Sequence, residues 1–230
     1  MKIKIVLVVV MILATYIYKN HSLNKLLKEL YKLAYVDKDE DGFLLQLSSL
    51  QAQMLMSNTS RKIMELNYWI YKDNKENVEK IAGQLKKHKM NTNNAISFYS
   101  LVIGYFADKK DAKALEYLEE LKSNCKLVSD PKQELLINDC EMACKIYINK
   151  DTSLIPTIEK ILEEDLDNEA KSIYQYRLAY LYKLNNNIDE CKFLLKEAMN
   201  NTSNIKSKNK IKSILNSGCE TLWLKRYFLT

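Results

Sequence analysis

Glycine and proline are scarce in this chain, whose 230 residues include four glycines and two prolines. Sandwiches and barrels need such residues at many of their turns, so the scarcity argues against an all-β fold. It also leaves no glycine-rich loop that could cradle a phosphate. Long β-branched runs are confined to the first 20 residues, and apolar residues elsewhere recur at helical spacing. The composition therefore predicts an all-α fold.

Signatures of metal binding and catalysis are also missing. The two histidines, His21 and His88, lie far in sequence from all five cysteines, and no two cysteines are spaced as CxxC. The sequence therefore lacks the closely spaced Cys and His ligands that a zinc site needs. No HExxH or GxSxG sequence occurs, and paired acidic residues fall on predicted exposed helix faces. We expect no enzyme, no cofactor, and five cysteines that are buried thiols suited to a reducing compartment.

Positive charge is concentrated at the two ends of the chain, whose net charge is +6. Residues 1–36 hold six lysines and one glutamate, and residues 206–230 hold five lysines, one arginine and one glutamate. Each end therefore carries +5, and the middle of the chain carries −4. This is not the continuous basic stripe that nucleic acid requires, so we expect no nucleic-acid partner. Basic ends suit anionic lipid headgroups, although ordinary solvated lysines give the same pattern.

Residues 5–18 form a run of 14 uncharged residues after Lys2 and Lys4. A membrane span needs about 20 residues, and a signal-peptide core is also of this length. No small-x-small cleavage site follows, and snorkelling of both lysines extends the usable length to about 18 residues. We therefore expect residues 1–20 to be a single-pass cell-membrane anchor, or else an uncleaved signal segment. Flanking lysines and free cysteines favour a cytoplasmic body, with an extracytoplasmic body as the alternative.

Successive helix pairs are predicted beyond residue 20. They are 22–36 with 43–56, 61–71 with 76–87, 94–107 with 112–123, 130–149 with 153–164, and 168–184 with 188–200. Asp130 is a good N-cap, Pro131 suits a first helical position, and Gln133 completes a capping box. The expected domains are an N-terminal pair with an acidic loop (21–58), helical repeats (59–203), and a capping helix with a basic aromatic tail (204–230).

Two of these pairs resemble tetratricopeptide repeats. The matching residues are Phe98, Leu101, Val102, Tyr105, Ala114 and Leu118 in one pair, and Leu178, Ala179, Tyr182, Cys191 and Leu195 in the other. Val102 and Gln175 depart from the family pattern, and both pairs lack its closing proline. The resemblance implies antiparallel helix pairs stacked as a superhelix behind the N-terminal hydrophobic helix. A non-repeat helical bundle is the alternative.

The resemblance also implies a binding surface, because the first helix of each repeat lines the concave face. Carried over residue by residue, it predicts a groove lined by Tyr99, Ile103, Phe106, Tyr176, Tyr180, Lys183, Asn67 and Tyr71. Tyrosines suit peptide recognition because they present large area with few rotamers to immobilise. The alternative is that these aromatics are core between repeats. The expected function is that of a membrane-tethered adaptor that binds a peptide or helix of a partner protein.

The acidic segment 37–42 supports a second hypothesis. Asp37, Asp39 and Asp41 alternate before Gly42, as in the calcium loop of an EF-hand between two helices. Ser48 stands where that loop needs a bidentate glutamate, so any calcium site would be weak. The protein would then be a calcium- or lipid-responsive regulator that uses this loop and the basic termini. A plain acidic loop between two helices, with Gly42 as the helix stop, is the simpler interpretation.

The predicted anchor can be tested by cell fractionation. Replacing Val9 and Ile12 with Asp should release the full-length protein from membranes, because each charge at mid-span costs about 3 kcal/mol on insertion scales. Val9→Leu with Ile12→Leu is the matched control and should stay in the membrane fraction. Recovery of the wild-type protein in the supernatant would refute the anchor.

Overall fold

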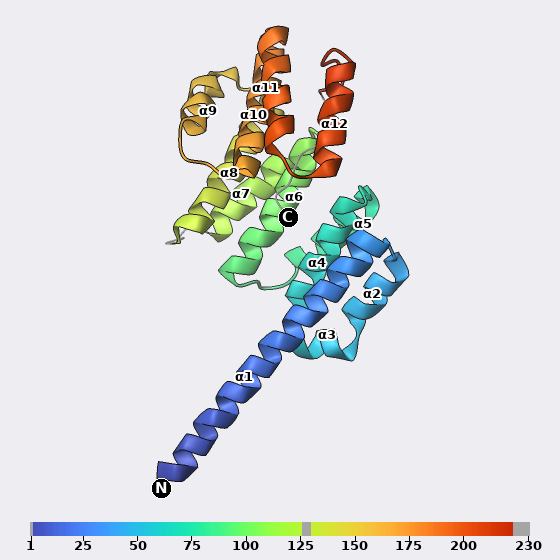
Figure 1. The fold of residues 1–230 in the computed structure, drawn as a ribbon, viewed down its shortest axis with the longest axis vertical. Helices are drawn as coiled ribbons and strands as arrows, with labels where there is room; N and C mark the ends of the chain where they lie inside the picture. The colour runs from blue at the N-terminus through green and yellow to red at the C-terminus, as the bar shows by residue number, and fades with distance from the viewer. Residues whose placement is uncertain (1, 126–129, 223–230) are drawn as a thin grey trace. The chain divides into compact units, whose positions relative to one another are not determined.

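The computed structural model describes residues 2–125 and 130–222, and their side chains except those of residues 2–16 and 206 (Figure 1). All regular secondary structure in these ranges is helical, so the predicted all-α fold is confirmed. The last residues of the predicted basic aromatic tail, 223–230, lie outside the described residues. The chain divides into two units, Met1–Phe98 and Tyr99–Thr230.

Unit 1 begins with a 30-residue helix, α1 (Lys2–Tyr31), which continues as a π-helix, η1 (Lys32–Asp37). The hydrophobic N-terminal segment and the first predicted helix are therefore parts of one continuous helix, as Figure 1 shows. Among the residues that the structure describes, no helix is long and apolar enough to cross a membrane. The structure thus gives no support to the membrane-spanning helix predicted within residues 1–20.

The helix predicted over 43–56 is divided into α2 (Glu40–Ser48) and α3 (Leu50–Leu55). Ser49 lies at the break, where its hydroxyl accepts a hydrogen bond of 3.2 Å from the Ala52 amide and so caps α3. The next two helices, α4 (Asn58–Tyr71) and α5 (Lys75–Lys86), contact each other as a pair. The core of unit 1 is formed by Leu26, Leu30, Phe43, Leu47, Leu66, Tyr68, Val78, Ala82 and Leu85. Full burial of each leucine stabilises the unit by about 2 kcal/mol.

Unit 2 takes in α6 from Tyr99 onward and all later helices. Their bounds are α6 (Thr92–Asp108), α7 (Lys113–Asn124), α8 (Pro131–Tyr147), η2 (Thr152–Leu154), α9 (Ile155–Leu162), α10 (Asn168–Leu184), α11 (Ile188–Asn201) and α12 (Ile205–Asn216). Contacts join α7 to α8, α10 to both α9 and α11, and α11 to α12. Asp130 caps α8 through a 2.9 Å bond from the Lys132 amide, which confirms the predicted helix start. All five cysteines are buried free thiols, as expected.

A common turn recurs along the chain. Five non-glycine residues with φ between 54° and 59° end a helix: Lys38, Asp73, Lys110, Lys150 and Asn186. The residue after each one caps the next helical segment by accepting a backbone N–H with its side chain, and these caps are Asp39, Asn74, Asp111, Asp151 and Asn187. The intervals between successive turns are 35, 37, 40 and 36 residues, close to the ~34 residues of a tetratricopeptide repeat.

A buried ion pair joins α8 to α10 in unit 2. Arg177 is 2% exposed, and its two terminal nitrogens donate to the two carboxylate oxygens of Asp139 at 2.5 and 3.0 Å. The guanidinium also lies over the Tyr174 ring, 5.4 Å from its centroid. Burial alone lowers the pKa of Arg177, but the Asp139 carboxylate more than offsets this, so the net shift is upward. Arg177 therefore stays charged inside the unit and depends on Asp139 for its counter-charge.

Removal of one partner of this pair should destabilise unit 2 strongly. Asp139→Ala leaves a buried cation without its carboxylate, which costs about 3 kcal/mol. Adding Arg177→Met should recover most of that loss, because the buried charge is then gone and the side-chain volume is nearly kept. Urea unfolding of the wild type, Asp139→Ala, Arg177→Met and the double variant measures this. Independent, additive effects of the two substitutions would contradict the assignment.

Candidate functional site

Five of the eight residues predicted to line a groove are buried in the helical core. These are Tyr99, Ile103, Phe106, Tyr176 and Tyr180, each at most 5% exposed. The Tyr99 hydroxyl donates to Glu120 at 3.3 Å and accepts from Asn124 at 2.8 Å, while Phe106 stacks on Tyr117 with ring centroids 5.6 Å apart. Both contacts hold α6 against α7. In this structure these five side chains pack between helices, which agrees with the alternative left open by the sequence.

Lys183, a sixth predicted groove residue, holds the end of the described chain. Its ammonium donates to the backbone carbonyls of Cys219 and Glu220, the latter at 3.0 Å. Burial lowers the pKa of this lysine. The side chain therefore ties α10 to the turn that follows α12 through these two hydrogen bonds within unit 2.

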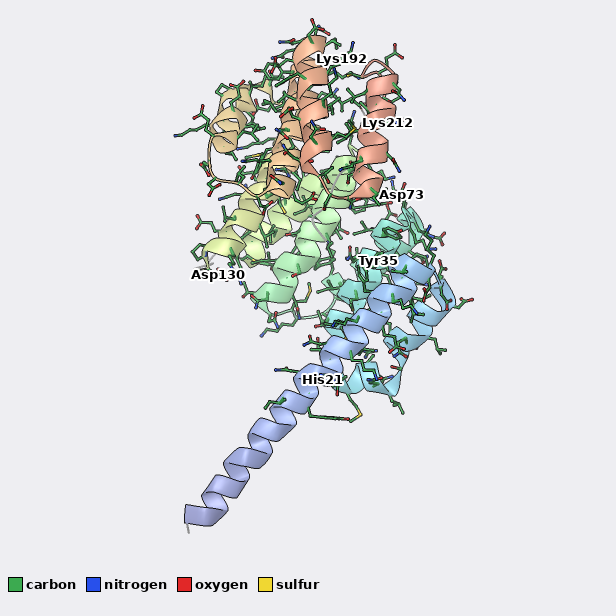
Figure 2. The ribbon with its side chains drawn as sticks, in the orientation of Figure 1. His21, Tyr35, Asp73, Asp130, Lys192 and Lys212 are labelled. Carbon is green, nitrogen blue, oxygen red and sulfur yellow. The ribbon has the colours of Figure 1, made fainter. Side chains whose placement is uncertain are left out.

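The remaining two predicted residues, Asn67 and Tyr71, lie together in unit 1. The Tyr71 ring meets the Tyr35 ring edge-on at 4.8 Å, and the Asn67 amide donates to the Tyr35 hydroxyl at 3.5 Å. Tyr31 lies 5.1 Å from Tyr35 and is 61% exposed, whereas the other three side chains are half-buried. Tyr31, Tyr35, Asn67 and Tyr71 are called the tyrosine cluster below. Figure 2 labels Tyr35 at the end of the α1–η1 helix, where the cluster lies.

In the tyrosine cluster the Tyr35 ring is half-buried and fixed by its neighbours, whereas the Tyr31 ring is exposed. Burial, followed by the neighbouring Tyr71 and Tyr31, raises the pKa of Tyr35 to about 12. The Tyr35 hydroxyl is therefore neutral near pH 7 and can both donate and accept a hydrogen bond. The rings of Tyr31 and Tyr71 and the Asn67 amide fix the orientation of Tyr35. Tyr35 therefore has little side-chain entropy left to lose when a partner packs on Tyr31. The arrangement can bind an apolar or aromatic side chain together with a backbone polar group.

Tyr31 and Tyr35 were not predicted as site residues. The family pattern draws its groove from the repeats, and these two tyrosines precede them, in the helix pair assigned to residues 21–58. A usable signal was present, since Tyr31 and Tyr35 are four residues apart and share a helix face. The π-helix that contains Tyr35 widens the turn at this point, and π-helical turns often occur at functional sites.

The aspartates of the acidic segment do not converge on one point. Asp37 pairs with Lys32 at 3.6 Å, whereas Asp39 accepts a 2.9 Å bond from the Gly42 amide and caps α2. No group of three or more acidic, histidine or cysteine side chains that could hold a metal occurs in the described part of the chain. The structure therefore does not support calcium binding by Asp37, Asp39 and Asp41. The segment is the first of the five recurring turns. The simpler interpretation was wrong about Gly42, because Lys38 ends the preceding helix and Gly42 lies inside α2.

Gly42 is coupled to this cap. A Cβ at Gly42 would overlap with the Asp39 carboxylate, so Gly42→Ala should break the cap at a cost of about 1 kcal/mol. The same substitution adds about 1 kcal/mol of helix propensity, so little net change is expected. In the Asp39→Ala background, where no cap remains to be lost, Gly42→Ala should stabilise by about 1 kcal/mol. Urea unfolding of the wild type, Gly42→Ala, Asp39→Ala and the double variant measures the coupling between the two positions. Additive changes in the free energy of unfolding would disprove the coupling.

Comparison with known proteins identifies no relative. No protein-family model, no curated protein and no solved structure matches this chain. The likeness to tetratricopeptide repeats therefore stays a prediction that rests on the residues of this chain and on its recurring turns.

Proposed function

We propose that the protein is a helical-repeat adaptor that binds a peptide or a helix of a partner protein through the tyrosine cluster. The observation that carries this proposal is the 61% exposure of Tyr31 beside the half-buried Tyr35 and Tyr71. Exposed aromatic rings on a rigid support are typical anchors of protein interfaces. The partner segment best suited to this surface offers an apolar side chain and a free backbone carbonyl or amide.

A stacked repeat architecture is part of the proposal. The five turns at intervals of 35 to 40 residues support it, because each turn reverses the chain between two helices in the same way. Helix pairs of this kind bury a continuous core by stacking, and repeat proteins use the resulting extended surfaces for binding. This role requires no catalytic group.

Attachment to a membrane is the third part. Its support is the sequence: 14 uncharged residues over 5–18, flanked by Lys2 and Lys4 on one side and Lys19 on the other. A short apolar segment with basic flanks favours binding to a bilayer that carries anionic lipids. The five buried free thiols suit a body on the reducing, cytoplasmic side.

The tyrosine cluster can be tested by affinity capture from cells that make the protein. Tyr31→Ala should weaken capture of the partner about tenfold or more, because an anchoring aromatic contributes at least ~1.4 kcal/mol. Since Tyr31 is exposed, the free energy of unfolding should change by less than about 0.5 kcal/mol.

The matched control is Phe193→Ala on α11, which removes another aromatic ring that is 56% exposed. This control should leave capture of the partner unchanged. A captured protein whose binding falls with Phe193→Ala and not with Tyr31→Ala would place the binding surface in unit 2 and refute the assignment to the tyrosine cluster.

A further inference from the structure

A stretch of unit 1 is free of charge. Residues 43–60 include no Asp, Glu, Lys, Arg or His, although 28% of the chain is charged. They form most of α2, all of α3 and the start of α4. Within this stretch Leu45, Leu50 and Met54 are 74%, 77% and 81% exposed, and the last two are the most exposed large apolar side chains of the described residues. Leu50 and Met54, both on α3, define the surface called the α2–α3 face below. Leu45 lies elsewhere on α2, because the neighbouring Gln46 donates to Glu29 near the Tyr31 end of α1.

The exposed residues of the α2–α3 face cannot be explained by packing within unit 1. Leu50 and Met54 are four residues apart, so they share one side of α3. Ala52, between them, is fully buried and points α3 into the unit. The exposed positions next to them, Gln51 and Gln53, carry neutral polar groups. The side of α3 turned away from the core therefore exposes two large apolar side chains and two neutral polar ones, and none of these four residues carries a charge.

The α2–α3 face lies beside the part of α1 that leads to the N-terminal apolar segment. α3 contacts α1, and Figure 2 labels His21 on α1 next to α3. Ile17 and Tyr18, one turn before His21, are 65% and 73% exposed. Figure 1 shows that the first part of α1 extends beyond the other helices of unit 1 at this end.

We propose that the α2–α3 face rests on an anionic lipid bilayer, next to the bilayer-bound N-terminal segment. The inference rests on the membrane attachment proposed above and adds a second contact to it. The transfer of leucine and methionine side chains from water to the acyl boundary is favourable in free energy. Glutamine and serine side chains are tolerated at headgroup depth. No charge has to be desolvated on this face. Exposed lysines on α1, Lys19, Lys25 and Lys28, add attraction to anionic headgroups.

Two contacts would orient unit 1 on the membrane. A single helix can tilt and rotate about its anchor, whereas a second point of contact limits both motions. Tyr31 lies fourteen residues beyond Ile17 on the same α-helix, about 21 Å along its axis. A bilayer that covers Ile17 and the α2–α3 face therefore leaves the tyrosine cluster raised above the headgroups and open to a partner.

The experiment places a photo-crosslinking amino acid at Leu50 of the full-length protein and, as the control, at Leu135 on α8, which is 68% exposed in unit 2. Both proteins are floated with vesicles of phosphatidylcholine and phosphatidylglycerol and then irradiated. We expect lipid adducts from position 50 at least tenfold above those from position 135. Leu50→Gln with Met54→Gln should also shift the Val9→Asp protein, whose anchor is weakened, at least tenfold towards the unbound fraction, while Leu135→Gln with Phe193→Gln should not.

Each other outcome decides against a specific part of the model. If the wild-type protein does not float with the vesicles, the membrane attachment itself is wrong, and this inference fails with it. If the wild-type protein floats but position 50 gives no more lipid adduct than position 135, only the lipid contact of the α2–α3 face is overturned. Crosslinks from position 50 to a second copy of the chain would assign the face to self-association instead.

Discussion

Every helix pair in this protein has to reverse direction in a chain that has almost no glycine. Each of the five recurring turns places a lysine, aspartate or asparagine in the left-handed region, which costs about 1 kcal/mol for a residue with a Cβ. The Asp or Asn that follows caps the next helical segment and returns about the same amount. The turn is thus nearly neutral in free energy, and it sets where each helix ends and the next begins. Packing of the helices then determines the stability.

The two units use polar groups inside their cores in different ways. Unit 2 buries a full charge, and the paired geometry of Arg177 and Asp139 fixes how α10 lies against α8. Only three of the 35 basic residues are arginine, and at this position a lysine could not make the same two-pronged contact. The described part of unit 1 has no buried charged side chain. Aromatic pairs join its helices, such as Phe43 with Tyr68 at 4.5 Å between ring centroids, as Phe106 with Tyr117 does in unit 2.

Unit 1 presents two surfaces of different chemistry on one helical frame. The tyrosine cluster combines aromatic rings with hydrogen-bonding groups, as protein interfaces do. The α2–α3 face is apolar and uncharged, as a surface in contact with lipid acyl chains is. Both include or adjoin α1, so a rigid helix sets their separation. The partner binding and the membrane contact proposed above both require this separation.

The sequence by itself determined the all-α fold, nearly all helix positions, and the capped start at Asp130, because propensity, capping and apolar spacing act over a few residues. It also predicted Asn67 and Tyr71 as binding residues, and the structure places both against Tyr35. It could not show that Tyr99 and Tyr180 are buried, since apolar spacing defines a helix face without stating which element covers it. Only the tertiary structure brought Tyr31 and Tyr35 to Tyr71, paired Arg177 with Asp139, and left Leu50 and Met54 uncovered. Each of these depends on contacts between segments far apart in the chain, which no local pattern encodes.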